Sequence, residues 1–155
     1  MDPDASLRAL REHAIPLDSV PLGDRTAPNG PRTSPSALAR SLADASVVGL
    51  GEAAHGTREC FEHKYRLIRS LVTECGVRTV AFGVDAAAAT VLDAFVRDES
   101  ALSTAPADAA AVLAEFDMWQ WRTESVRDLL EWLEAFNTGD ALSAQVRIAP
   151  SVDHA

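Results

Sequence analysis

The hydrophobic positions of this chain follow two spacings, one typical of buried strands and one typical of amphipathic helices. A continuous apolar run at residues 47–50 predicts a first strand buried on both faces, residues 78–84 predict a second buried strand, and residues 145–148 predict a third strand. Apolar residues three and four positions apart predict helices over residues 6–13, 35–44, 58–75, 86–97, 107–116 and 123–137. From residue 47 on, the predicted order is strand, helix, strand, helices, strand.

Capping residues mark the ends of several of these helices. Ser34 before Pro35 predicts one helix start, and Thr57 and Thr123 predict two others. Gly76 predicts the end of the helix that begins after Thr57. Four prolines and two glycines within residues 15–32 predict a loop.

This order predicts an α/β fold with a parallel sheet of about three strands and flanking helices. We expect residues 1–155 to form one domain, of which residues 1–33 are mostly loop with one short helix. The last strand has no helix after it, so the sheet looks incomplete, and we expect self-association through its uncovered edge.

Composition narrows the classes of partner. The formal net charge is -9 at pH 7, which disfavours binding to a nucleic acid backbone. The basic residues are thirteen arginines and one lysine, a composition typical of proteins from a high-salt cytoplasm. Cys60 and Cys75 lie too far apart on one predicted helix to form a disulfide, as expected in a reducing compartment. No signal peptide or membrane span is predicted, so a cytoplasmic location is expected.

The turn between the first predicted strand and the helix at residues 58–75 holds two chemically active side chains. Glu52 and His55 are three residues apart, close enough for the carboxylate to orient the imidazole. Histidine titrates near neutral pH and is suited to act as a general base toward water. The alternative is that Glu52 caps the helix and His55 is a polar turn residue. Spacing alone favours that alternative.

Other candidate residues carry weaker signals. Glu59 and His63 share a helix face, but HxxxH and HExxH patterns are absent, so no metal is predicted. Lys64 is the single lysine and could pair with a carboxylate or a substrate oxyanion. The sequence also lacks a GK[ST] phosphate loop and a GxSxG nucleophile motif, so no cofactor is predicted.

A second aromatic group follows later in the chain. Trp119 and Trp121 alternate as in a strand or an extended loop, and Arg122 comes next. They could line a pocket for a large apolar ligand, or they could plug the end of the sheet.

Four segments together resemble the erythromycin esterase family. GLGEAAHGTRECFEHKYRLIRSLVTECG resembles its GExxHGxxE turn and the helix that follows, and LREHAIPL, WQWRTESVRDLLEWLEAFN and VRIAPSVD are similar to further segments in the same order. The resemblance implies an α/β fold and hydrolysis of a carboxylic ester, such as a macrolide lactone, by water that a histidine activates. It implies His55 as the general base, Glu52 as its orienting partner and Lys64 in the active-site cleft. Glu59 matches the acidic position after the turn.

Two departures from the family pattern leave the activity open. Where the family has AxEAD after its second strand, this chain has AFGVD, so Gly83 stands in place of a catalytic glutamate and Asp85 matches the later aspartate. Family members are also longer, and their remaining part supplies another active-site histidine. The chain is therefore interpreted either as a hydrolase of a small-molecule ester or as a truncated, inactive member that acts as a binding or interaction module.

Overall fold

The computed structural model describes residues 3–15, 17, 34–51, 55, 57–97, 108–114, 119–138 and 144–151. Its elements in chain order are α1 (Pro3–His13), α2 (Pro35–Ser41), α3 (Arg58–Cys75), β1 (Thr79–Phe82), α4 (Ala86–Val96), α5 (Ala109–Ala114), the 3₁₀ turn η1 (Trp119–Trp121), α6 (Glu124–Asn137) and β2 (Arg147–Pro150). The mixed α/β class predicted from the sequence is confirmed. The extended geometry predicted for Trp119 and Trp121 is wrong, because both lie in η1.

Side chains cap the starts of four described helices, the fourth being α5, where the N–H of Ala111 donates to Asp108 Oδ1 at 2.7 Å. The backbone N–H of Ala37 donates to Ser34 Oγ at 3.2 Å, and that of Val126 donates to Thr123 Oγ1 at 3.3 Å. Asp85 caps α4 through the N–H of Ala88 at 2.8 Å. Helix α3 ends at Gly76, whose φ of 74° is left-handed.

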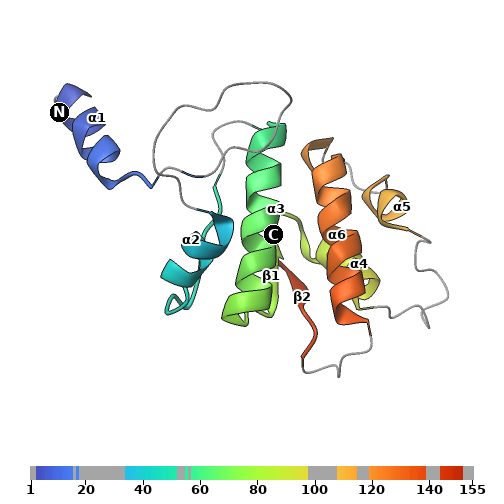
Figure 1. Cartoon of the computed structure of the whole chain (residues 1–155). Helices are drawn as coiled ribbons and strands as arrows, with labels where there is room; N and C mark the ends of the chain where they lie inside the picture. The colour runs from blue at the N-terminus through green and yellow to red at the C-terminus, as the bar shows by residue number, and fades with distance from the viewer. Residues whose placement is uncertain are drawn as a thin grey trace, which may run out of the picture.

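The sheet of the described residues has two parallel strands, β1 and β2. Thr79 lies opposite Arg147 and Phe82 lies opposite Pro150. Helices α3 and α6 lie side by side, and α2 packs against α3 on the side away from α6 (Figure 1). Helix α4 packs along β2. The chain between β1 and β2 therefore forms a crossover that places helices over the sheet.

The strand predicted at residues 47–50 is not formed. Residues 46–51 pair with no strand in the described part of the chain, and Val47 is 87% exposed. Val48 and Leu50 are half-buried against the apolar cluster of α2 and α3. The apolar residues Val48 and Leu50 are therefore explained by contacts with the helices and not by burial within a sheet.

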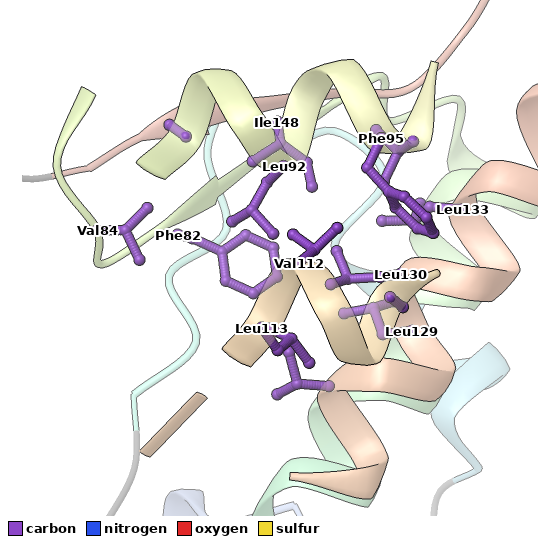
Figure 2. Close-up of a cluster of buried hydrophobic side chains, with 14 of the residues drawn as sticks. Phe82, Val84, Leu92, Phe95, Val112, Leu113, Leu129, Leu130, Leu133 and Ile148 are labelled. Carbon is purple, nitrogen blue, oxygen red and sulfur yellow. The ribbon is translucent and has the colours of Figure 1, made fainter. Parts of the chain in front are cut away.

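The main hydrophobic core lies between β1, β2 and the helices that follow β1. Figure 2 shows the side chains of Phe82, Leu92 and Val112 gathered at its centre, with Leu130 and Ile148 beside them. A second, smaller core joins α2 to α3 and contains Ala39, Leu67 and Leu71.

Arginines and aromatic rings line the contact between α3 and α6. The guanidinium of Arg69 lies 5.5 Å from the ring centroid of Tyr65 and 4.9 Å from that of Trp132. Arg78 lies 5.5 Å from the ring of Phe136. Stacking of this kind stabilises by about 0.5–1 kcal/mol at exposed sites, so it reinforces a contact that the apolar core already makes.

Asn137, at the end of α6, is buried and fully hydrogen-bonded. Its Nδ2 donates to the carbonyl of Val96 at 2.7 Å and to that of Val146 at 2.9 Å. Its Oδ1 accepts the N–H of Val146 at 2.7 Å. One amide thus joins the ends of α4 and α6 to the residue before β2.

Replacing Asn137 should therefore cost more stability than any exposed change nearby. In Asn137→Asp, a carboxyl group of the same shape loses two donors and faces two carbonyl oxygens. We expect a loss of about 3 kcal/mol or more in the free energy of unfolding, measured by urea titration. The neighbouring exposed variant Thr138→Ala should change it by less than about 0.5 kcal/mol. Equal effects of the two variants would contradict the role given to Asn137.

Polar contacts also tie α2 to α3. Glu74 accepts hydrogen bonds from Ser36 Oγ and from Arg40, both at 2.7 Å. The Ser36 hydroxyl, with help from Arg40, lowers the pKa of Glu74 below its ordinary value of 4.5. The thiol of Cys75 donates to the carbonyl of Ala39 at 3.3 Å.

The lowered pKa of Glu74 predicts a pH dependence of stability. A carboxyl whose pKa falls on folding stabilises the protein above its unfolded pKa, and that contribution is lost as the pH falls through the folded pKa. Melting temperatures should therefore decrease as the pH drops below about 4.5. Glu74→Gln should flatten this acid limb, and Ser36→Ala should flatten it in part. An acid limb unchanged in Glu74→Gln would contradict the assignment.

Candidate functional site

The candidate site lies at the carboxyl ends of β1 and β2, where ligands bind in open α/β sheets. Trp121 connects the elements at this end. Its ring centroid is 6.1 Å from that of Phe61, in the first turn of α3, and 5.4 Å from that of Phe82, the last residue of β1. Both contacts are edge-on, a favoured geometry for aromatic rings. The start of α3 is therefore held against the end of β1.

Lys64 belongs to the same group of side chains. Its Nζ lies 5.2 Å from the ring centroid of Phe61, and the residue is half-buried. A cation over an aromatic face is stabilised by the negative charge of the ring face. The structure thus places the predicted cleft lysine on Phe61, whose ring in turn contacts Trp121.

The predicted general base lies just before α3. His55 is an exposed turn residue, two positions before the N-cap Thr57. Glu52 lies outside the described residues, so its expected contact with His55 stays a prediction. Glu59 is exposed in the first turn of α3, where a carboxylate interacts favourably with the positive end of the helix.

Two other predicted site residues have structural partners. Asp85 caps α4. Arg122 donates from NH2 to the carbonyl of Ala114 at 3.1 Å, which joins η1 to α5. Trp119 is 64% exposed, whereas Trp121 packs into the core. Of the two interpretations of this aromatic group, the contacts of Trp121 fit the one in which it plugs the end of the sheet.

Two buried nitrogen atoms at this end of the chain were not foreseen from the sequence. Nδ1 of His63 and Nε1 of Trp121 are buried and have no hydrogen-bond partner among the residues that the structure describes. Leaving such a group unpaired costs about 1–3 kcal/mol, so it often marks a site that carries strain or chemistry. The sequence marks these residues only as a helical histidine and an aromatic.

Gly83 lies beside the unpaired indole. A Cβ built on Gly83 would meet Cζ2 of Trp121 at 3.5 Å and Oγ of Ser151 at 4.0 Å, both ordinary contacts. Its φ does not lie in the left-handed region, so the backbone does not require glycine here. A larger side chain at this position would start next to the edge of the Trp121 ring.

Charge at the start of α3 is locally compensated. Arg58 donates to Glu62 Oε1 at 2.6 Å, one helical turn later. This hydrogen bond raises the pKa of the Arg58 guanidinium. Within the described residues, no group of three or more His, Cys, Asp or Glu side chains is placed to hold a metal ion. In the same part of the chain, no helix has the length and hydrophobicity to cross a membrane.

Comparison with known proteins identifies the family of the chain. The erythromycin esterase family model matches residues 72–149, half of the chain. The chain therefore belongs to the erythromycin esterase family, as the sequence resemblance implied. The match runs from the last turn of α3 to β2, and it does not include His55 or Lys64.

A solved structure extends the likeness to the remaining residues. The crystal structure of a Bacillus cereus protein matches 97% of this chain with a TM-score of 0.61 and 25% sequence identity. The matched region is 33% of the Bacillus cereus chain. This chain therefore spans about a third of the length of that similar protein.

The geometry at Gly83 leads to a prediction about a carboxylate at this position. Gly83→Glu should fold, and its side chain should reach the indole N–H of Trp121, because Nε1 and Cζ2 lie on the same edge of the ring. At pH 7 we expect this variant to be more stable than Gly83→Met by about 1–2 kcal/mol. The indole N–H resonance of Trp121 should also move downfield. Equal stabilities and an unmoved resonance would show that position 83 does not face the indole.

Proposed function

We propose that this chain carries the water-activating part of an ester hydrolase site. The observation that supports it most is the position of Lys64 over the ring of Phe61, which packs on Trp121 at the carboxyl ends of the strands, in a member of the erythromycin esterase family. His55 lies in the turn that leads into the same helix. The substrate class is a small, largely apolar carboxylic ester, of which a macrolide lactone is one case.

Each proposed residue has one role in the hydrolysis. His55 accepts a proton from water as the water oxygen forms a bond to the carbonyl carbon. Glu52 orients the imidazole and stabilises its positive charge. The ammonium of Lys64 stabilises the oxyanion that develops on the carbonyl oxygen. The intermediate then breaks its bond to the alcohol oxygen, which takes the proton from His55, and an acid and an alcohol are released.

In this proposal, aromatic side chains exclude water from the site and contact the apolar part of the substrate. The rings of Phe61, Trp121 and Phe82 exclude water from the side of the site that faces the core, and a low local dielectric strengthens the interaction between Lys64 and an oxyanion. The exposed ring of Trp119 is available to contact an apolar part of the substrate.

A second candidate function is ester binding without hydrolysis. The observation that favours it is Gly83, which places hydrogen where the family pattern has a catalytic glutamate, next to Trp121 and Ser151. Such a member would act as a binding or interaction module. The hydrolase and the binding module would both bind the ester, but only the hydrolase would turn it over.

A comparison of His55→Gln with the unchanged chain tests the proposal. Glutamine cannot accept and release the proton of water, so hydrolysis of p-nitrophenyl acetate and of erythromycin should fall by about 10²–10⁴-fold. Because His55 is exposed in a turn, the melting temperature should not change.

The control is His13→Gln in α1, which should hydrolyse both esters like the unchanged chain. Equal turnover by His55→Gln would refute His55 as the base. Absence of turnover in every variant, with erythromycin binding retained, would establish the binding module instead.

A further inference from the structure

The outer edge of β2 is the side that does not face β1. The N–H of Arg147 donates to the carbonyl of Arg78 at 2.9 Å, and that of Ser151 donates to the carbonyl of Phe82 at 2.8 Å. Peptide groups alternate in direction along a strand, so the odd-numbered positions of this strand face β1. Residues 146, 148 and 150 therefore present their peptide groups outward.

The first outward position is taken by Asn137. Its side-chain amide accepts the N–H of Val146 at 2.7 Å and donates to the carbonyl of Val146 at 2.9 Å. This is the pair of bonds that a neighbouring strand would make. An incoming strand would have to break both of them in a buried site.

The second outward position is taken by Asp93 of α4. Its Oδ1 accepts the N–H of Ile148 at 2.7 Å, and its Oδ2 lies 3.3 Å from Arg147 NH2 and 3.4 Å from Arg97 NH1. The side chain of Asp93 is 13% exposed, and that of Arg97 is 14% exposed. Two arginines thus hold the carboxylate in place, and a charged acceptor binds an N–H more strongly than a carbonyl does.

The third outward position has no donor, because residue 150 is proline. Proline within sheets is confined to edge strands and bulges for this reason. The outward N–H groups of residues 146 and 148 are therefore already bonded to side chains, and residue 150 has no N–H to offer. The expectation of an uncovered edge at the last strand does not hold along β2.

We propose that β2 is built as the terminal strand of the sheet, and that Asn137, Asp93 and Pro150 prevent a further strand from pairing with it. A second copy of this chain is the partner that these residues exclude. Two β2 strands could otherwise pair antiparallel about a two-fold axis at Ile148, whose N–H and carbonyl both point outward. Any strand that extends the sheet pairs at β1.

The proposal is tested by opening the edge at its two replaceable positions. Asp93→Ala removes the acceptor from the N–H of Ile148, and Pro150→Ala restores a donor at residue 150. In the full chain with both changes, sedimentation equilibrium should show self-association at least about tenfold tighter than in the unchanged chain, as expected for a freed strand edge. Ala81→Pro, which removes an outward N–H from β1, should not reverse this new association.

Hydrogen exchange at the amide of Ile148 gives a second, independent measurement. Exchange should be about 10- to 100-fold faster in Asp93→Ala, as loss of a bond to a charged acceptor implies. In Asp93→Asn it should stay slow, because the amide oxygen still accepts. This comparison needs only the single variants and holds if the double variant does not fold.

Two results would overturn the proposal. One is a folded Asp93→Ala, Pro150→Ala double variant that sediments like the unchanged chain. The other is exchange at Ile148 that is the same in Asp93→Ala and in the unchanged chain.

Discussion

The structure depends most on the side-chain amide of Asn137. A buried amide is favourable only when its donors and its acceptor are satisfied, and Asn137 meets this condition with two donated bonds and one accepted bond. Its partners belong to the end of α4 and to the approach to β2. The amide therefore fixes where α4 and α6 end relative to the sheet, and the apolar side chains between them can pack in one arrangement.

This anchor and the candidate site lie at opposite ends of the same strands. Asn137 acts where β2 begins, whereas Trp121 packs where β1 ends. Because the hydrogen bonds of Asn137 stabilise the other end of the strands, the carboxyl end can tolerate unpaired polar atoms and exposed residues. The buried nitrogens of His63 and Trp121 illustrate this, since neither has a hydrogen-bond partner within the described part of the chain, and an unpaired buried group lowers stability.

The helices were predictable because their signals are local. Ser34, Thr57, Thr123 and Gly76 mark helix ends correctly, and apolar spacing identifies the buried faces. The segment at residues 47–50 was wrongly predicted as a strand, because a short apolar run does not distinguish a paired strand from an extended segment that lies on helices.

The candidate site was predictable in its residue types and less so in its contacts. The resemblance to a family pointed to His55 and Lys64, and the structure adds that Lys64 sits on Phe61 and that Trp121 lies beside Gly83. The roles of Asn137 and Asp93 were not predictable. In the sequence, Asn137 is only a helix end and Asp93 only a polar residue of an amphipathic helix. Asn137 bonds to Val96 and Asp93 to Ile148, and both partners are far away in the sequence.

The parallel pairing of β1 with β2 also has a consequence for how the chain reaches its native state. Thr79 pairs with Arg147, so folding must bring together two residues that are far apart in the sequence. Closing the chain between them costs conformational entropy. Helices α4 and α6 supply Asp93 and Asn137, the side chains that receive β2. Folding should therefore be limited by a late docking of β2 and show the slow rates typical of non-local pairing, with the segment after α6 the last to become protected.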